Sequence, residues 1–208
     1  MNLEYYFWVF KKAVPDHICD DMIKYGLQRK ETMATTGGYS DVGTLTPPQI
    51  KDLKKKRDSN IMFFNEAWMF KELLSYVNLA NRNAGWNFQW DHGEVCQFTK
   101  YNKGQYYGWH TDSWHKAYDK PNTPSHGKIR KLSVTLSLSD PKTYVGGELE
   151  FDFRNLDPDK KPVPRICKEI RPKGSLVIFP SEVWHRVRPV TKGTRYSLVV
   201  WYLGAPFK

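Results

Sequence analysis

YNKGQYYGWHTDSW, residues 101–114, contains two types of metal-binding side chain in the triplet His110-Thr111-Asp112. In an extended strand alternate side chains share a face, so His110 and Asp112 would point the same way with Cα atoms roughly 6.6 Å apart. On a helix, side chains two residues apart diverge, and helical metal sites use spacings of three or four instead. The triplet therefore predicts a strand that presents an imidazole and a carboxylate to one metal ion.

A candidate third ligand, His185, follows the apolar run 174–179 and a turn at Pro180-Ser181. Two imidazoles and one carboxylate on one side of an iron ion leave coordination positions open for chemistry, so this set predicts a catalytic metal site. From His185 onward, HRVRPV, TKGT and RYSLVVWY read as strand, turn and strand, which predicts a β-hairpin centred on Lys192-Gly193.

Arg195 acquires a role from this predicted hairpin. It would lie about five residues along the ladder from His185, a gap of roughly 16 Å at about 3.3 Å per residue. A long arginine together with a five-carbon dicarboxylate could span that gap. One end of 2-oxoglutarate would chelate the metal, and its far carboxylate would meet the guanidinium in a bidentate, charge-assisted pair. Ser197 shares the arginine's face and could add a hydrogen bond.

The chain resembles the prolyl 4-hydroxylase-type branch of the iron- and 2-oxoglutarate-dependent dioxygenases, and most closely the bacterial PKHD-type hydroxylases. The likeness covers roughly residues 95–203 and is carried by ordered segments, namely Tyr101–Asp112, Leu132–Pro141, Gly146-Gly147-Glu148-Leu149, Leu176–Pro180, His185–Gly193 and Arg195. The resemblance implies a double-stranded β-helix, a jelly-roll barrel that holds these residues inside its mouth. It also implies Fe(II), 2-oxoglutarate and oxygen as reaction partners, and a dependence on ascorbate.

The resemblance further assigns roles to single residues. It implies His110, Asp112 and His185 as the iron ligands and Arg195 as the anchor of the co-substrate. Tyr101 would hydrogen-bond the same distal carboxylate. Base demethylases related to this family carry a second arginine six residues after the anchor, where this chain has Trp201, so the resemblance argues against base demethylation.

The 208 residues are expected to form a single domain, mainly β with supporting helices, in the α+β class. Residues 95–203 would be the catalytic double-stranded β-helix, and residues 1–94 would provide helical support and a lid loop. Tryptophans in and near the motifs could line the substrate cleft or pack in the core; they are Trp109, Trp114, Trp184 and Trp201.

Sequence patterns before residue 95 predict one strand and two helices. YYFWVF at residues 5–10 reads as an edge or supporting strand. A first helix should begin at Pro15-Asp16, with an apolar stripe at Ile18, Met22, Ile23 and Leu27. Asn65 is the expected cap of a second helix, and Gly85 falls where a left-handed residue would end it.

Residues 35–60 are rich in Gly, Pro, Ser, Thr and charge, which reads as a long connection with little core of its own. Such connections are often lids, and we hypothesise that residues around Tyr39 to Thr46 fold over the target. An insert without function is the alternative. Residues 114–129 and 154–168 read as two further loops, and His115 and His126 in the first are expected not to be ligands.

The chain has 32 Lys and Arg against 22 Asp and Glu, a net charge of +10. This field favours acidic partners, although the runs at 51–57 and 128–131 also fit a solvated surface. Three cysteines without a pairing pattern argue against a disulfide framework, so a cytoplasmic location is expected. No stretch approaches the roughly 20 apolar residues of a membrane span.

Three classes of function remain open at this point. The favoured class is a hydroxylase of prolyl residues in a peptide or protein. The second is a hydroxylase of a free amino acid or another small metabolite, which would share every metal and co-substrate residue. The third, suggested only by the charge, is a nucleic-acid-binding module that uses the same barrel.

Overall fold

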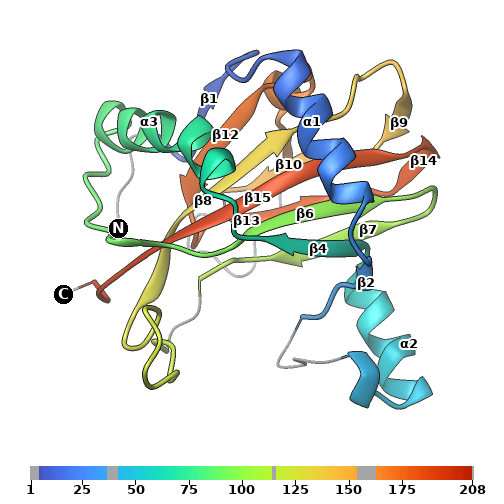
Figure 1. The fold of residues 1–208 in the computed structure, drawn as a ribbon, viewed down its shortest axis with the longest axis horizontal. Coiled ribbons are helices and arrows are strands. Elements are labelled where there is room, and N and C mark those ends of the chain that lie inside the picture. Colours follow the sequence, from blue (N-terminus) through green and yellow to red (C-terminus); the bar gives the residue numbers. More distant parts are fainter. Residues whose placement is uncertain (1–4, 37–41, 114–115, 154–162, 208) are drawn as a thin grey trace.

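The computed structural model describes residues 5–36, 42–113, 116–153 and 163–207, and within them the chain is mainly β with three α-helices (Figure 1). Its larger sheet has the order β1-β12-β8-β15-β6-β4-β2, with β5 paired to β15, and its smaller sheet has the order β11-β10-β13-β7-β3. Strands β14 and β9 form a separate pair. This confirms the predicted fold class, a jelly roll with supporting helices.

The larger sheet consists of β1 (Trp8–Phe10), β2 (Thr32–Met33), β4 (Asn60–Phe64), β5 (His92–Gly93), β6 (Cys96–Tyr101), β8 (Ile129–Ser137), β12 (Leu176–Pro180) and β15 (Arg195–Gly204). The smaller sheet consists of β3 (Arg57–Asp58), β7 (Tyr106–His110), β10 (Leu149–Asp152), β11 (Arg165–Ile166) and β13 (Trp184–Val187). The separate pair is β9 (Tyr144–Gly146) and β14 (Val190–Gly193). Helical segments are α1 (Asp16–Leu27), α2 (Pro47–Lys56), α3 (Ala67–Asn83), η1 (Val42–Thr44) and η2 (Lys168–Ile170).

The larger sheet has a hydrophobic core on each of its faces. On β12, Leu176 and Ile178 pack in a core with residues of α1 and α3, whereas Val177 and Phe179 pack in a second core with Phe151 of the smaller sheet. Alternate residues of a strand point to opposite faces, so a strand buried on both sides reads as a continuous apolar run. Figure 1 shows α1 and α3 together on one side of the larger sheet.

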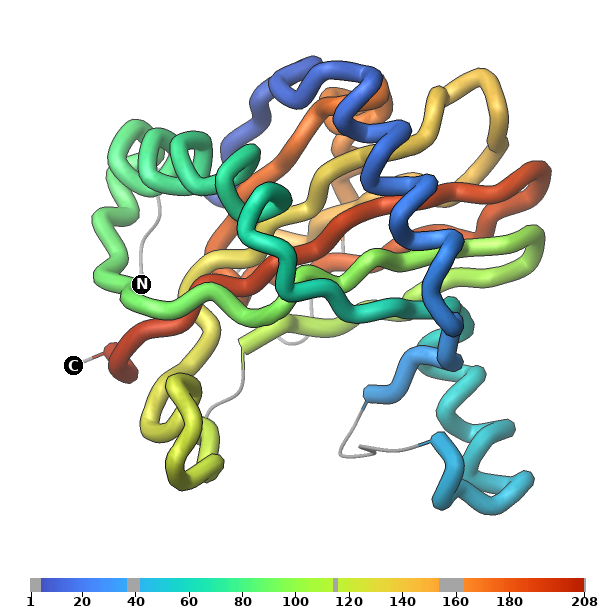
Figure 2. Tube along the Cα trace, viewed as in Figure 1, coloured from blue at the N-terminus to red at the C-terminus, as the bar shows by residue number. Residues whose placement is uncertain are grey.

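Three adjacent strands of the larger sheet, β8, β15 and β6, carry polar side chains on the face that looks toward the smaller sheet. Figure 2 shows β15 running between β8 and β6, which come from much earlier in the chain. Their buried polar residues recur every second position; they are Gln97 and Thr99 on β6, Ser133, Thr135 and Ser137 on β8, and Arg195 and Ser197 on β15. This face therefore offers hydrogen-bonding groups to a polar ligand.

The two predicted helices, α1 and α3, agree with the sequence patterns except at one cap. Helix α1 begins at Asp16, and Gly85 follows α3 with φ of +69°, as predicted. The predicted cap at Asn65 is wrong, because α3 begins one residue later than that cap requires. Its cap is Glu66, whose backbone is extended and whose carbonyl accepts the Met69 N–H at 3.1 Å.

Residues 35–60 contain more regular structure than predicted. The described part includes η1, all of α2 and β3, and Leu53, Arg57 and Ser59 are buried. Two prolines open α2, and the Thr46 N–H donates to Gln49 Oε1 at 2.8 Å in a capping interaction. The described part of the segment is therefore largely helical and not an irregular connection, but it does have little core of its own, as expected, because Leu53 is its one buried apolar side chain. The proposed lid lies only partly within the described residues, since residues 39–41 fall outside them.

The C-terminal strands also differ from the prediction, because residues 185–202 do not form a hairpin. Strand β13 pairs with β7 and β10 in the smaller sheet, β14 pairs with β9, and β15 lies in the larger sheet between β8 and β6. At Gly193, φ is +74° and a Cβ would lie 2.1 Å from Thr143 O. The backbone at Gly193 therefore packs directly against the residue before β9, just before the chain enters the larger sheet. His185 and Arg195 thus belong to different sheets.

The second of the two predicted loops is partly wrong as well. Residues 116–128 contain only turns and irregular backbone, but residues 163–168 include β11, which pairs with β10. In the parts of the chain described above, no helix combines the length and apolar character needed to cross a membrane.

Candidate active site

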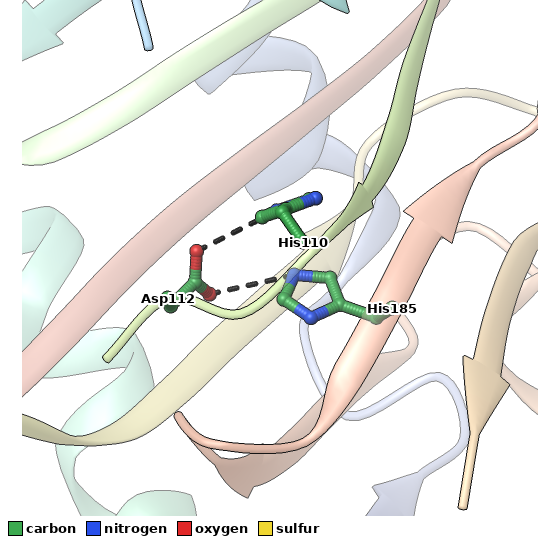
Figure 3. A group of neighbouring side chains, drawn as sticks. All are labelled: His110, Asp112 and His185. Atoms are coloured by element: carbon green, nitrogen blue, oxygen red, sulfur yellow. Dashed lines mark ion pairs between the residues drawn. The ribbon is translucent and has the colours of Figure 1, made fainter. Parts of the chain in front are cut away.

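His110, Asp112 and His185 converge at one end of the smaller sheet (Figure 3). His110 is the last residue of β7 and pairs directly with His185 of β13, while Asp112 lies just beyond the end of β7. One donor atom from each residue lies within 4.8 Å of the other two. The expected continuous strand through Asp112 is wrong, yet the chain still turns its carboxylate toward both imidazoles.

Each imidazole is oriented by the backbone carbonyl of the residue two positions earlier in the chain. His110 Nδ1 lies 2.8 Å from Gly108 O, and His185 Nδ1 lies 2.9 Å from Val183 O. A carbonyl can only accept, so each Nδ1 carries the hydrogen and each Nε2 keeps its lone pair. These Nε2 atoms lie 3.6 Å and 3.5 Å from the two carboxylate oxygens of Asp112. The donor lone pairs therefore face a common point.

Two serines that sequence reasoning missed hold Asp112. Ser133 Oγ donates to Asp112 Oδ2 at 2.7 Å and lies 2.9 Å from Ser181 Oγ. The Asp112 N–H donates to Ser181 O at 2.8 Å. Partners of this kind fix the orientation of a metal-binding carboxylate. The available signal was the regular insertion of serine in the apolar segment Leu132–Ser139.

The electrostatics of the cluster favour the protonation states that bind a cation. Burial, and then the neighbouring His185, lower the pKa of His110 to about 3, so its imidazole is neutral near neutral pH. Burial opposes the ionisation of Asp112, but His185, His110 and Arg130 outweigh it and lower the pKa of the carboxyl group to about 2. Neutral imidazole nitrogen atoms and a carboxylate are the donors of a two-histidine, one-carboxylate iron site, so the residues fit Fe(II).

A small inner cavity connects this cluster to the predicted co-substrate residues. Its walls include all three residues of the cluster together with Tyr101, Arg195 and Ser197. Arg195 pairs with Tyr101 across β15 and β6, and its Nη1 donates to Ser197 Oγ at 3.2 Å. The path from the cluster to Arg195 thus crosses the space between the two sheets. The prediction that it follows the ladder of one hairpin is wrong.

Arg195 and Tyr101 are both buried in the wall of this inner cavity. The guanidinium carbon of Arg195 lies 5.4 Å from the centroid of the Tyr101 ring. Burial raises the pKa of the Tyr101 phenol, and the charges of Arg57 and Arg195 act in the opposite direction. The phenol therefore stays protonated near neutral pH and can donate a hydrogen bond to an anion.

The absence of a side chain at Gly147 leaves the space that the stem of Arg195 occupies. Gly147 has φ of +65°, and a Cβ built on it would lie 2.9 Å from Arg195 Cδ and 3.0 Å from Val190 Cγ2. The first distance is shorter than real Cβ contacts allow, so any larger residue would displace the arginine stem. Gly147 therefore sets the position of the guanidinium in the cavity.

Gly147→Ala is expected to weaken the binding of 2-oxoglutarate by about tenfold or more, because a displaced guanidinium loses its alignment with a carboxylate. Titration calorimetry of the Fe(II)-loaded protein without oxygen measures this affinity. Gly85→Ala is the matched control, since Gly85 has φ of +69° but open space around a Cβ. Equal affinities in the two variants, at equal folded fractions, would show that the contact with Arg195 is unimportant.

A second, outer cavity, larger and more open than the first, also reaches the cluster, at His110 and Asp112. Its lining is rich in aromatic rings and includes three of the four tryptophans proposed for the cleft, namely Trp109, Trp184 and Trp201. Trp114 lies outside the described residues. His126 is half exposed and lies 3.8 Å from Asp119, away from the cluster, and His115 is outside the described residues. The cluster thus borders both a small inner cavity and a larger open one.

Known proteins resemble this chain in both sequence and fold. A PKHD-type hydroxylase of Pseudoalteromonas atlantica (strain T6c / ATCC BAA-1087) is 37% identical over 107 residues, which are 50% of this chain and 41% of that protein. The chain thus spans about two fifths of the length of this curated relative. The viral collagen prolyl hydroxylase of Paramecium Bursaria Chlorella virus-1 has a similar fold, with a TM-score of 0.60 at 18% identity, covering 98% of each chain.

A Pseudomonas putida prolyl-4-hydroxylase also has this fold, with a TM-score of 0.61 at 19% identity, covering 96% of this chain and 92% of the other. At such identities the likeness concerns the fold alone. The model of the 2OG-Fe(II) oxygenase superfamily matches residues 96–203, a little over half of the chain and the part that holds every residue of the cluster and the inner anchor. The chain belongs to the 2OG-Fe(II) oxygenase superfamily.

Proposed function

We propose that this chain is a 2-oxoglutarate-dependent dioxygenase that hydroxylates an unactivated carbon, with a prolyl residue in a peptide or protein as its target. The observation that carries the proposal is that the cluster of His110, Asp112 and His185 borders two cavities. One cavity is small and is lined by Arg195. The other is larger, open and lined by aromatic rings.

Each residue of the site has a role in this proposal. His110 and His185 offer Nε2 and Asp112 offers its carboxylate to Fe(II), and Ser133 holds the carboxylate in place. Bound Fe(II) supplies oxygen activation, coupled to the decarboxylation of 2-oxoglutarate to succinate and carbon dioxide, and thereby the power to oxidise a C–H bond. The protein positions the reactants and excludes water.

The inner cavity would hold the co-substrate. Arg195 would pair with the distal carboxylate of 2-oxoglutarate, and Tyr101 and Ser197 would complete its hydrogen bonds. The aromatic lining of the outer cavity, including Trp109 and Trp184, supports a peptide target, because proline-rich segments dock in aromatic grooves. A requirement for ascorbate is carried over from the family resemblance, and a cytoplasmic location from the cysteine pattern; all three cysteines are free and buried.

The second candidate is a hydroxylase of a free amino acid or another small metabolite. It would use the same ligands and the same anchor. Arg57 favours it, since this buried guanidinium lines both cavities and a free amino acid carries a carboxylate. The nucleic-acid module receives less support, because Arg57 and Lys131 are buried and Lys128 forms an ion pair with Asp91 at 2.6 Å.

Mass spectrometry tests the proposal. The Fe(II)-loaded protein is incubated with 2-oxoglutarate and a lysate of its source, and peptides and metabolites are searched for a gain of one oxygen. We expect new hydroxyproline in a peptide, absent when Asp112→Ala protein is used. Oxygen gained by a metabolite instead would support the second candidate, and the absence of both succinate and oxidised product would overturn the oxygenase assignment.

A further inference from the structure

Arg57 is a buried arginine beside the cluster that has no part in the favoured function described above. It follows α2 directly, begins β3 and pairs with Tyr107 of β7. Only 5% of the residue is exposed. Its Nε donates to Ser59 Oγ at 3.0 Å, and its guanidinium carbon lies 4.4 Å from the centroid of the Tyr107 ring. One hydroxyl and one aromatic face thus hold the side chain in place.

Arg57 lacks an acidic partner, unlike other arginines near it. Within the described residues, no carboxylate oxygen lies within 4.0 Å of its nitrogen atoms, whereas Arg130 pairs with Glu94 at 2.5 Å and Arg186 with Glu150 at 2.6 Å. Among the arginines that the structure describes, Arg195, the proposed anchor, is in a comparable setting, and its described polar partner is Ser197. A buried charge without a counter-ion is costly, and a ligand that supplies the counter-ion removes that cost.

The guanidinium of Arg57 lies where a ligand can reach it from two sides. The residue lines both the inner and the outer cavity, together with Tyr107 and His110. Its planar fork of donors matches the two oxygens of a carboxylate.

We propose that Arg57 is a second carboxylate-binding residue of the site, placed on the metal side of the cavity while Arg195 serves the far end. Its ligand is either the carboxylate of 2-oxoglutarate next to the keto group or a carboxylate of the target. The identity of these ligands rests on the proposed function. The need of Arg57 for an anion rests on its burial and its lack of an acidic partner.

The test compares four probes on the Fe(II)-loaded protein, with oxygen excluded, by titration calorimetry. 2-Oxoglutarate carries both carboxylates, and 2-oxobutyrate keeps only the one next to the keto group. L-Proline and L-prolinamide, added in the presence of 2-oxoglutarate, differ in one carboxylate. The variants are Arg57→Gln, Arg57→Lys and Arg195→Gln. Arg188→Gln is the charge-matched control, because Arg188 is half exposed and lines neither cavity.

Two results would support the proposal and identify the source of the carboxylate. If the ligand is the co-substrate, Arg57→Gln weakens both 2-oxo acids by about tenfold or more, whereas Arg195→Gln weakens only 2-oxoglutarate. If the ligand is the target, Arg57→Gln leaves both 2-oxo acids unchanged and removes the preference of the wild type for L-proline over L-prolinamide. Arg57→Lys should lie between wild type and Arg57→Gln in either case.

The contrary result is equal binding of every probe by wild type and both Arg57 variants, which overturns the proposal whether or not the chain is an oxygenase. If the wild type binds L-proline but neither 2-oxo acid, the proposed function is overturned. The comparison of L-proline with L-prolinamide in wild type and Arg57→Gln then tests the role of Arg57 alone. Thermal unfolding without ligand checks that each variant folds. If Arg57→Gln does not fold, Arg57→Lys provides the same comparison.

Discussion

Replacing Asp112 with alanine is expected to abolish iron-dependent formation of succinate from 2-oxoglutarate. The carboxylate is buried and faces the Nε2 atoms of His110 and His185 at 3.6 Å and 3.5 Å. Partners that only orient a ligand cost about 10- to 100-fold in metal affinity when removed, and loss of the ligand itself should exceed that range. Iron content after dialysis and succinate formation at saturating 2-oxoglutarate measure the two effects.

Asp119→Ala is the matched control for this variant, because Asp119 has 81% of its side chain exposed and lies beside His126, away from the cluster. It should keep wild-type iron content and wild-type turnover. Asp112→Ala protein that keeps both at the wild-type level would contradict the assignment of the metal site. Thermal unfolding of the metal-free proteins shows whether loss of iron binding reflects loss of the fold.

Replacing Arg195 with methionine is expected to have the second largest effect, on the binding of 2-oxoglutarate. Truncating one partner of a buried, hydrogen-bonded charge pair costs about 2–5 kcal/mol, roughly 30-fold or more in affinity. The stability of the unliganded protein should change little, because Arg195 is buried without a carboxylate partner among the described residues. A large stability loss with unchanged affinity would point to a structural role instead.

Two measurements separate these outcomes for Arg195→Met. Titration calorimetry of the Fe(II)-loaded protein without oxygen gives the affinity, and thermal unfolding without ligand gives the stability. Arg188→Met removes an arginine that is half exposed and pairs with Glu150 at 3.6 Å, so it should leave the affinity unchanged. An Arg195→Met protein that binds 2-oxoglutarate as tightly as this control would contradict the anchor assignment.

The residues that carry the chemistry of the site were easier to predict from the sequence than the pairing of the strands that hold them. The spacing of His110 and Asp112 restricts how they can share a metal, and the resemblance over residues 95–203 supplied His185 and Arg195. The apolar run before His185 also gave β12 correctly. Local side-chain patterns carry this information because they depend on which residues share a face.

The pairing of strands could not be predicted in the same way. The segment around Lys192-Gly193 has the composition of a hairpin turn, but its two flanks enter different sheets. A strand's alternation shows which of its faces is buried and does not identify its neighbour, which depends on contacts distant in sequence. For this reason the sequence pattern placed His185 and Arg195 on one hairpin, whereas they lie on strands of different sheets.

Arg57 and Ser133 were missed because their roles come from burial. In the sequence, Arg57 ends the basic run Lys51–Arg57, which reads as a solvated surface. In the structure α2 keeps its three terminal lysines exposed, while the following residue enters β3 and is buried against Tyr107. Ser133 looks like any serine in an apolar strand until the fold brings Asp112 to it.

Crystals of the Fe(II)-loaded protein, with anomalous diffraction measured at the iron absorption edge, test the central claim most directly. The account predicts one iron atom within bonding distance of His110 Nε2, His185 Nε2 and an Asp112 carboxylate oxygen, with the inner cavity leading from it to Arg195. Iron bound at any other group of side chains, with these three left uncoordinated, would contradict it.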